Sequence, residues 1–474
     1  MLLKRIYHDG LAQASYLIAC EESRAALIVD PLRDVERYLS IAADEKLTIT
    51  DVAETHIHAD FVSGARDLAR KAGARLHVSD MGPTDWKYGA IDDGTDLLHD
   101  GSAFDVGCVR IDVMHTPGHT PEHVVFLVTD TATADAPIGA VTGDFIFVGD
   151  VGRPDLLEKA AGVAGTKEAA ARDLFRSLQR FKSLPDYLQL WPGHGAGSAC
   201  GKALGAMPSS TLGYEKLFNW GLVENDEEAF VRQVLTGQPD PPAYFAIMKQ
   251  MNRDGPPPSP SVPPPDIFAP EVAARIAYGK VIVDTRLPGD FAEKHVVSSI
   301  NVPYTKSFLT YAGQVLPYDR DLYLIVTEGT ADSVIDDLAL IGIDHVGGVY
   351  SFRSIEDLKS AGVQMQSTPQ LTIGSLKDRL SSNGQRVLDV RNRDEWDHGH
   401  IPGAIHIPLG SLQSRLGEIP RSGDIAVQCQ GGTRSAIAAS ILQRNGINVS
   451  NVAGGFSEWE RSGGEVERGS SSPP

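Results

Sequence analysis

An internal repeat in the C-terminal half constrains the fold more than any other feature of the sequence. The segment VDTRLPGDFAEKHVVSSINVP, from Val283, aligns without gaps on LDVRNRDEWDHGHIPGAIHIP, from Leu388. Further along, LYLIVTEGTADS aligns on IAVQCQGGTRSA. A repeat of this kind means that one supersecondary unit occurs twice. Because strand, turn and helix signals alternate in both copies, the sequence predicts two successive α/β modules, each with a small parallel sheet.

A proline-rich stretch separates this repeat from the first half of the chain. DGPPPSPSVPPPD, from Asp254 to Asp266, predicts an extended spacer, and QSTPQ, from Gln366, marks a softer boundary. A length of 474 residues is compatible with about three domains. We therefore expect an N-terminal domain, a linker, two repeat modules and a disordered tail, over residues 1–253, 254–265, 266–365, 366–468 and 469–474, respectively.

The composition argues against some classes of partner. The chain has 43 Lys and Arg against 62 Asp and Glu, and a formal net charge of −19 disfavours nucleic acids and anionic membranes. No apolar run is long enough to span a bilayer, and MLLKRIYHDG is typical of a strand and turn rather than a signal peptide. The cysteines are scattered without a CxxC pair, so we expect free thiols and a cytoplasmic, reducing compartment for Cys20, Cys108, Cys200 and Cys429.

Strand and helix signals alternate in the first half of the chain. LHVSD, CVRIDVMH and HVVFLV are short apolar runs of the kind that form strands. A helix is predicted from Ser63 to Ala72, with Ser63 as its N-cap and Gly73 as its stop. A second helix is predicted over residues 168–182, and its apolar stripe should pack in the core: Leu174, Phe175, Leu178 and Phe181.

Cys429 lies where a predicted strand, Ile425 to Val427, meets a predicted helix. The intervening loop can turn its N–H groups inward and bind an anionic substrate at the positive end of the helix, through Gln430, Gly431, Gly432 and Thr433. Arg434 adds a fixed positive charge to this loop. We therefore expect Cys429 to hold a thiolate or persulfide rather than to be a buried structural cysteine.

The last hundred residues resemble the rhodanese (thiosulfate sulfurtransferase) family, through DVRNRDEWDHGHIPGAIHIP, CQGGTR and AGGFSEW. The resemblance implies that Cys429 becomes a cysteine persulfide and passes its outer sulfur to an acceptor. The first copy has Val326 in place of Cys429 and Ala331 in place of Arg434. Without a thiol it cannot carry sulfur by this route, so we expect it to dock the active copy or to build an oligomer interface.

Four motifs in the first half are rich in metal-ligating side chains. They are THIHAD with His56, His58 and Asp60, HTPGHT with His115 and His119, TGD with Asp144, and PGHG with His194. Two imidazoles two residues apart at a strand end can face one cavity, and later loops can add a third imidazole and a carboxylate. The four motifs together therefore predict a metal site.

These motifs resemble the metallo-β-lactamase superfamily, an αββα sandwich, over about the first 200 residues. The opening motif of that superfamily is HxHxDH, but here Phe61 occupies the last position, which removes a ligand of the second metal. A mononuclear site is therefore expected, similar to that of the persulfide dioxygenase branch. This resemblance implies one Fe(II) per chain, held by His56, His119 and Asp144. It places His58, Asp60 and His194 around the ligands, and makes His115 the weaker choice within its motif.

The whole chain resembles the multidomain persulfide dioxygenase–sulfurtransferases of the CstB type. This implies that O2 oxidises a low-molecular-weight thiol persulfide to sulfite, and that Cys429 transfers sulfane sulfur to sulfite to give thiosulfate. Cys200, six residues after His194, either exchanges sulfur with the substrate near the metal or is an ordinary buried thiol. Coenzyme A, glutathione and bacillithiol are all compatible carriers, and a homo-oligomer is expected.

Two other functions are compatible with parts of the sequence. The metal motifs also occur in zinc-dependent thioester hydrolases of the glyoxalase II type, which would leave the rhodanese-like module as an accessory. Alternatively, the metal is structural and the protein is a sulfur carrier or scaffold in which only Cys429 matters. No GxGxxG follows a predicted strand, so neither a nicotinamide nor a flavin cofactor is expected.

Overall fold

The computed structural model describes residues 1–89, 91–156, 158, 165–202, 204–238, 241–260 and 262–468. The predicted tail over 469–474 lies outside these ranges, and the predicted spacer has neither helix nor strand over 255–260. The chain forms two compact units. The first is Met1–Ser259 with Ala339–Gly342, and the second begins at Pro260. Within the described ranges, no helix is both long enough and apolar enough to cross a bilayer.

The first unit contains two six-stranded sheets, of order β1-β2-β3-β4-β5-β6 and β12-β11-β10-β9-β8-β7. The first sheet consists of β1 (Leu2–His8), β2 (Gln13–Ala19), β3 (Ala25–Val29), β4 (Thr48–Ala53), β5 (Arg75–Ser79) and β6 (Asp96–Leu98). The second consists of β7 (Ala103–Val106), β8 (Val109–His115), β9 (Val124–Asp130), β10 (Gly139–Gly143), β11 (Gln189–Pro192) and β12 (Ser210–Thr211).

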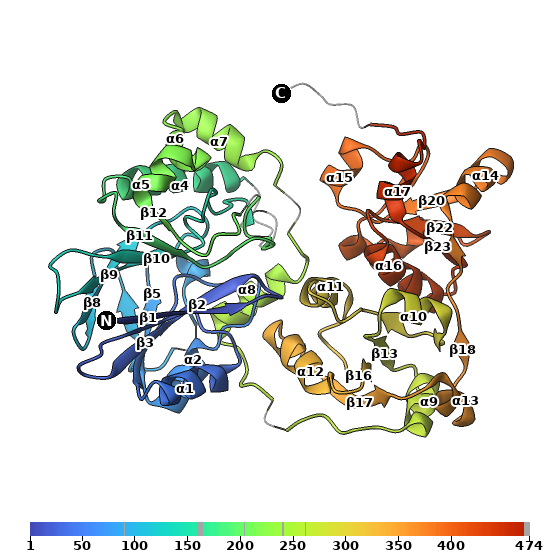
Figure 1. Ribbon diagram of the computed structural model, residues 1–474, viewed down its shortest axis with the longest axis horizontal. Helices are drawn as coiled ribbons and strands as arrows, with labels where there is room; N and C mark the ends of the chain where they lie inside the picture. Colours follow the sequence, from blue (N-terminus) through green and yellow to red (C-terminus); the bar gives the residue numbers. More distant parts are fainter. Residues whose placement is uncertain are drawn as a thin grey trace. The chain divides into compact units, whose positions relative to one another are not determined.

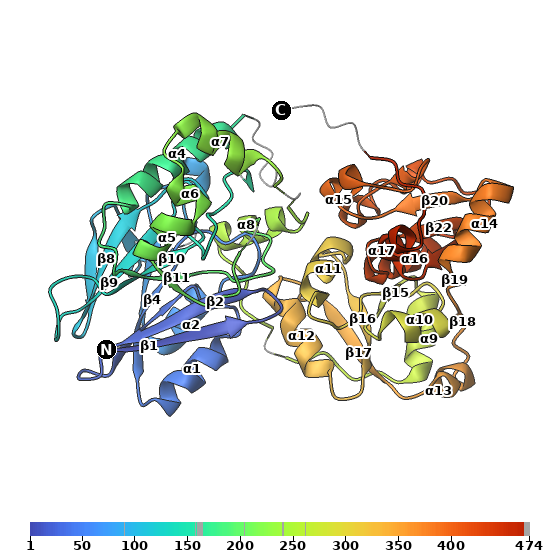
Figure 2. The same ribbon diagram turned by 45° about the horizontal axis from the view of Figure 1, so that its top comes forward.

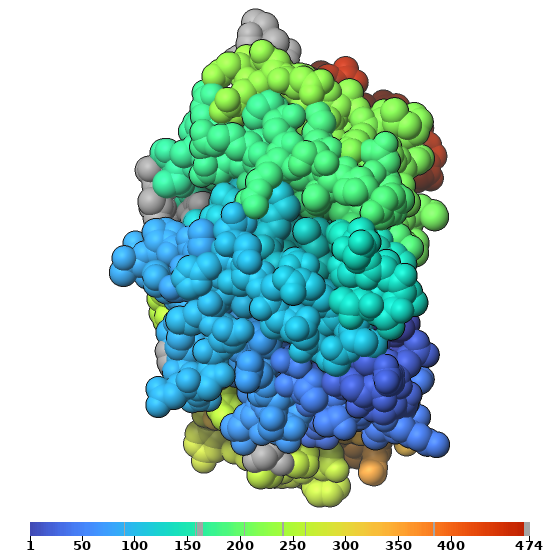
Figure 3. Space-filling view, turned by 90° about the vertical axis from the view of Figure 1, so that its left-hand side faces the viewer, coloured from blue at the N-terminus to red at the C-terminus, as the bar shows by residue number. Residues whose placement is uncertain are grey.

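Helices cover the outer faces of both sheets (Figure 1). α1 (Val35–Asp44) and α2 (Ala65–Ala72) pack against β4 of the first sheet. The second sheet shares a core with α4 (Lys167–Phe181), α5 (Leu212–Phe218), α6 (Trp220–Val223) and α7 (Glu227–Leu235). The unit also contains α8 (Phe245–Asp254). In the space-filling view of Figure 3, the green segments of α4 to α7 lie above the blue and cyan ones.

The inner faces of the two sheets share one apolar core. Tyr16 and Leu27 of the first sheet pack in the same cluster as Ile111 and Phe126 of the second. Burial of this face on each sheet is what holds two sheets together, because the alternating side chains of a strand point to opposite faces. The predicted αββα sandwich is therefore confirmed.

Most of the local elements predicted in this unit are present. The three apolar runs form β5, β8 and β9, and the apolar stripe on α4 is buried in the core, as predicted. The helix predicted from Ser63 begins instead at Ala65, with Gly64 as its N-cap. The Ser63 hydroxyl donates a hydrogen bond to the Glu54 carboxylate and accepts one from Ala65 N–H at 3.0 Å. Gly73 ends the helix at φ 66°, a conformation that favours glycine.

The prediction of four free cysteines is wrong. Cys20, directly after β2, forms a disulfide with Cys108 in the turn between β7 and β8, with a Cα–Cα distance of 5.4 Å. The two are 88 residues apart, and pairing of the two sheets brings them together, so no local spacing signals the bond. Cys200 and Cys429 are free and buried. The cysteine argument for a reducing compartment is weakened accordingly.

The second unit contains two modules with parallel sheets. The first module runs from α9 (Ala269–Ala277) to β18 (Met365–Gln366) and has a four-stranded sheet of order β15-β13-β16-β17. Its other elements are β13 (Val281–Asp284), α10 (Pro288–Glu293), β14 (His295–Val296), β15 (Ile300–Asn301), α11 (Phe308–Val315), β16 (Leu322–Thr327), α12 (Ala331–Leu340), β17 (Val346–Phe352) and α13 (Ile355–Ser360).

The second module runs from β19 (Gln370–Leu371) to α17 (Gly455–Arg461) and has a five-stranded parallel sheet of order β19-β23-β22-β20-β21. Its other elements are α14 (Ile373–Asn383), β20 (Arg386–Asp389), α15 (Arg393–His398), β21 (Ile405–His406), β22 (Ile425–Gln428), α16 (Thr433–Arg444) and β23 (Val449–Val452). The two sheets agree with the α/β modules predicted from the repeat.

The repeat extends to buried side chains. Asp284 forms an ion pair with Arg286 at 2.6 Å, and Asp389 forms one with Arg391 at 2.7 Å. Each guanidinium also lies over an aromatic ring, that of Phe352 or Phe456, respectively. Buried charges are tolerated only when they are paired in this way. The shared pairs therefore fix the same turn after the first long strand of each module.

Strand pairing also aligns the two loops that differ in chemistry. The two buried aspartates lie opposite Ile325 on β16 and Gln428 on β22. The next residue is Val326 in the first module and Cys429 in the second. Residues that align in the two sequence repeats therefore occupy equivalent positions in the two sheets. The first module has no thiol at the position of Cys429.

Candidate metal centre and sulfur-transfer site

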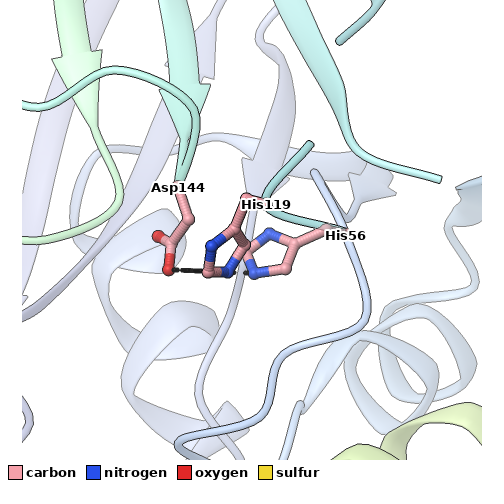
Figure 4. Close-up of side chains that lie close together, drawn as sticks. All are labelled: His56, His119 and Asp144. Carbon is pink, nitrogen blue, oxygen red and sulfur yellow. Dashed lines mark ion pairs between the residues drawn. The ribbon is translucent and has the colours of Figure 1, made fainter. Parts of the chain in front are cut away.

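Three predicted ligands come together in the first unit (Figure 4). His56 follows β4, His119 lies in the loop between β8 and β9, and Asp144 directly follows β10. One donor atom of each lies within 4.8 Å of the other two, and all three side chains are buried. Asp144 Oδ2 is 3.4 Å from His119 Nε2 and 3.9 Å from His56 Nε2. Strand ends from both sheets therefore converge on one point.

The donor atoms in this group suit a cation. Both oxygens of Asp144 are buried, and neither accepts a hydrogen bond from any residue in the described part of the chain. An unpaired buried carboxylate is costly, and a bound cation removes that cost. His119 Nδ1 contacts the carbonyl of Arg153 at 3.0 Å, and His56 Nδ1 contacts Thr55 Oγ1 at 2.9 Å. Such contacts leave each Nε2 free to bind a metal.

The electrostatics of the group keep both imidazoles neutral. Burial and the neighbouring imidazole of His58 hold the pKa of His56 well below its usual range. Burial also lowers the pKa of His119, although Asp144 opposes the shift. A neutral imidazole has a lone pair for a metal, whereas an imidazolium has none. The two histidines are therefore in the protonation state that metal binding requires.

The other predicted metal-site residues lie around this group. His194 Nε2 is 3.5 Å from Asp144 Oδ1 and 3.3 Å from Asp60 Oδ2. His58 Nε2 instead lies 3.2 Å from Asp30 Oδ1. Burial acts to lower the pKa of His58, but Asp30 outweighs it and raises the pKa to about 9. His58 is therefore protonated at neutral pH, and it is not in the donor group.

Phe61 and Cys200 occupy the rest of the neighbourhood. Phe61 is buried, with its ring 4.4 Å from that of His58, so an apolar group stands where the superfamily motif has a ligand. Cys200 is buried, and its sulfur lies within 4.8 Å of donor atoms of Asp60 and His194. Burial, then the charges of Asp144 and Asp60, raise the pKa of the Cys200 thiol well above its usual value. Cys200 is thus a neutral thiol beside the metal ligands.

His115 Nε2 contacts the carbonyl of Pro121 at 2.8 Å, outside the donor group.

Sequence reasoning missed the residues that hold the ligand loops in place. Glu122 Oε1 accepts a hydrogen bond at 2.7 Å from the N–H of Ile57, between the two histidines of THIHAD. Asp30 accepts bonds from Thr55 N–H at 2.7 Å and from Thr55 Oγ1 at 2.9 Å. The only sequence signal was an acidic residue next to an apolar run, which also fits an exposed turn.

The loop after Cys429 in the second module lies between a strand and a helix, as predicted. Cys429 follows β22 directly, and α16 begins four residues later at Thr433. Gly432 N–H donates to Cys429 Sγ at 3.1 Å, and Ser435 Oγ lies 3.5 Å from the same sulfur. Gly432 adopts φ 112°, which is open to glycine and strained for other residues. The loop therefore turns a backbone donor onto the sulfur at the positive end of α16.

Two predicted loop residues have partners that were not foreseen. Arg434 is not an unpaired charge, because it forms a bidentate ion pair with Glu395. The Gln430 amide donates to Ser457 Oγ at 2.9 Å, and its oxygen accepts from Arg391 at 3.2 Å. Gln430 is therefore engaged in holding the loop, whereas Gly431 and Thr433 line a cavity.

Comparisons with known proteins identify the two domains in which these residues lie. The sequence profile of the Metallo-beta-lactamase superfamily matches residues 8–194, and that of the Rhodanese-like domain matches residues 372–462. The structure is similar to a metallo-beta-lactamase from Staphylococcus aureus subsp. aureus COL, with 40% identity and a TM-score of 0.67. That similarity covers 74% of this chain and 99% of the other.

Two curated relatives each match one part of the chain. A putative sulfur carrier protein, YrkF, of Bacillus subtilis (strain 168) is 35% identical over 95 residues, which are 20% of this chain. The chain spans 51% of that protein's length. A probable polyketide biosynthesis zinc-dependent hydrolase, BaeB, of Bacillus velezensis is 24% identical over 212 residues, which are 44% of this chain and 85% of the relative.

Proposed function

This chain belongs to the metallo-β-lactamase superfamily and ends in a rhodanese-like domain, and on this premise we propose that it is an iron-dependent persulfide dioxygenase coupled to a sulfurtransferase. The observation that carries the proposal is the donor group of two imidazoles and one carboxylate. The same chain has Cys429 in a strand–helix loop, with its sulfur accepting a backbone N–H. The substrate is a low-molecular-weight thiol persulfide, RSSH, and the co-substrates are O2 and sulfite.

The donor set favours iron over a pair of zinc ions. Two histidines and one carboxylate on one face leave coordination positions open, an arrangement that suits non-haem Fe(II). Phe61 supplies an apolar ring near His58 where a dinuclear centre would need another ligand. When bound, ferrous iron would supply the electrons that activate O2. His56, His119 and Asp144 would hold it, and His194 and Asp60 would border the same space.

The oxidation balances with O2 alone. RSSH, O2 and H2O give RSH, sulfite and two protons, because the outer sulfur loses four electrons and one O2 accepts four. No nicotinamide or flavin is needed for this stoichiometry. The chain's contribution is to bind the metal, to keep both histidines neutral, and to orient their rings through Arg153 and Thr55.

The second module would consume the sulfite. The Cys429 thiolate attacks the outer sulfur of a second RSSH, the S–S bond breaks, and the thiol RSH leaves with the electron pair and the proton. Sulfite then attacks the outer sulfur of the Cys429 persulfide, and thiosulfate leaves with the thiolate restored. The N–H of Gly432 stabilises the anionic sulfur at both stages. Linking producer and consumer in one chain raises the effective concentration of sulfite.

One alternative has a specific observation in its favour. The name of the relative BaeB gives it as a probable zinc-dependent hydrolase, so a zinc-dependent thioester hydrolase with an accessory sulfurtransferase is the second candidate. Anaerobic loading of the full chain with Fe(II) or with Zn(II) separates the two. We expect O2 uptake and thiosulfate formation from glutathione persulfide with iron alone. Thioester cleavage with zinc, and no O2 uptake with iron, would reverse the assignment.

A further inference from the structure

The second unit contains a cavity of about 650 Å³ beside the loop that follows Cys429. The second module contributes the loop from Gly431 to Thr433 and the end of β23. The first module contributes α10, through Gly289 and Glu293 among others. α10 packs against α16, and Figure 2 shows the two helices in the same unit. A module without a reactive thiol therefore forms one wall of a cavity at the sulfur-transfer loop.

The walls are held together by hydrogen bonds between the two modules. Thr368, in the segment that joins the modules, donates its N–H to the carbonyl of Ala292 on α10 at 2.9 Å. Its hydroxyl donates to the side-chain oxygen of Gln443 on α16 at 2.8 Å. Thr368 thereby links α10 of the first module to α16 of the second. Hydrogen bonds within the folded unit therefore hold the two sides of the cavity in place.

The lining is polar but almost uncharged. Asn451 lines the cavity and is 6% exposed, and its Oδ1 accepts no hydrogen bond from any residue that the structure describes. Its amide nitrogen donates to Gln370 Oε1 at 2.9 Å, which fixes the side chain. Thr368 and Thr433 also line the cavity. Among the described lining residues, Glu293 is the only one with a charge, and it is negative.

This chemistry indicates the class of ligand. The amide and hydroxyl residues of the lining match the N–H and O–H groups of amides and alcohols. Glu293, with no cation beside it in the lining, disfavours an anionic body. The cavity volume falls in the range of sites for small organic molecules. The loop that lines the cavity also donates the Gly432 N–H to Cys429 Sγ, so a ligand bound here lies against the loop that holds the reactive sulfur.

We propose that this cavity binds the amide- and hydroxyl-bearing arm of the thiol that delivers sulfur to Cys429. The inference rests on the proposed sulfurtransferase function and deepens it. The bound arm holds RSSH while the S–S bond of RSSH breaks and a new S–S bond forms between its outer sulfur and Cys429. RSH leaves with the proton and the electron pair. The first module then sets which thiol is used, although it carries no sulfur itself.

A substitution on the first module tests this without touching the loop. A side chain at Gly289 would meet no atom within 4 Å at its Cβ, so Gly289→Trp fills the cavity from α10 without a clash at the backbone. Gly374 is the matched control. It is also the second residue of a helix, α14, it also has no atom within 4 Å, and it does not line this cavity.

The assay compares a donor with an arm and a donor without one. Pantetheine persulfide has a neutral arm with two amides and hydroxyls, whereas thiosulfate is a small anion, and cyanide accepts sulfur from Cys429 in both reactions. We expect Gly289→Trp to raise KM for pantetheine persulfide about tenfold or more, with KM for thiosulfate within about twofold of wild type. Gly374→Trp should change neither value, and calorimetry should show pantetheine binding to wild type and to Gly374→Trp only.

Each outcome has a distinct meaning. If wild type transfers sulfur from neither donor, the proposed sulfurtransferase function falls. If it transfers from both and Gly289→Trp leaves KM for pantetheine persulfide unchanged, the function stands and the cavity assignment falls. An equal effect of Gly374→Trp would also overturn the assignment. If Gly289→Trp does not fold, as judged by lost thiosulfate activity, the smaller Gly289→Leu is assayed with the same expectations.

Discussion

Arg434 and Glu395 form a two-pronged ion pair in the second module, with Nη1–Oε2 and Nη2–Oε1 distances of 2.6 and 2.7 Å. The pair lies close enough to Cys429 for Arg434 to interact electrostatically with its sulfur. Burial acts to raise the pKa of Glu395, but the hydrogen bonds from Arg434 outweigh it, and the pKa is lowered. The positive charge that the sequence places beside the sulfur is thus matched by a carboxylate on α15.

Removal of Arg434 alone should be worse than removal of both partners. Arg434→Ala leaves the Glu395 carboxylate partly buried and unpaired near an anionic sulfur, which raises the energy of the thiolate and the persulfide. We expect thiosulfate-to-cyanide transfer to fall about tenfold or more, and Arg434→Ala/Glu395→Ala to recover part of that loss. The four rates form a double-mutant cycle. A double variant slower than Arg434→Ala would mean that Glu395 contributes to sulfur transfer independently of Arg434.

Cys429→Ser should separate the two proposed activities. A hydroxyl cannot form a persulfide, so we expect transfer from thiosulfate to fall by about a hundredfold or more, to the background rate. Oxygen uptake with persulfide should remain, because the metal ligands lie in the other unit. Sulfite should then accumulate in place of thiosulfate, and ion chromatography measures both. Thiosulfate formed at the wild-type rate would show that sulfur reaches sulfite without Cys429.

The sequence predicted features that depend on local order along the chain. His56 and Asp144 follow apolar strands and His119 lies in the loop between two of them, so their convergence followed once the sheets formed. Glu122 and Glu395 were missed because their partners are far away in sequence, at Ile57 and Arg434. The Cys20–Cys108 disulfide was missed for the same reason. A spacing pattern reports neighbours within one element, whereas these contacts arise only when separate elements pack together.

The metal should stabilise the first unit through Asp144. Its two oxygens accept no hydrogen bond from the described residues, so a bound cation supplies their only strong partner there. We expect Asp144→Ala to lower iron content, after loading and desalting, by at least about tenfold. Chelation should then lower the Tm of the wild type but leave that of Asp144→Ala unchanged. Asp60→Ala is the control, because Asp60 lies outside the donor group of His56 and His119. Equal iron loss in both variants would argue against the assigned ligand set.

Glu122 should make the first unit less stable as the pH rises. Burial raises the pKa of Glu122 from 4.5 to about 7, so the folded state binds its proton more tightly than the unfolded state does. The stabilisation from that proton is complete below about pH 4.5 and is lost as the pH rises through about 7. Glu122→Gln keeps an acceptor for Ile57 N–H but cannot ionise.

The two proteins should therefore have similar stability at pH 5, and Glu122→Gln should be more stable at pH 8, by about 2–3 kcal/mol. Denaturant unfolding of the metal-free protein, followed at several pH values, measures the difference. Glu22→Gln, at an exposed position between β2 and β3, should show no such trend. A stability gap that is constant from pH 5 to pH 8 would mean that Glu122 does not titrate in this range.

Cys200 should not act as a sulfur nucleophile. The thiolate is the reactive form of cysteine, and burial beside Asp144 and Asp60 raises the pKa of this thiol well above its usual value. We expect Cys200→Ala to retain iron and to keep O2 uptake within about threefold of wild type, because the loss is only one of packing. Mass spectrometry after brief exposure to persulfide should find added sulfur on Cys429 and not on Cys200. A loss of O2 uptake of tenfold or more with iron content unchanged, together with sulfur on Cys200, would instead make this thiol part of the oxidation path.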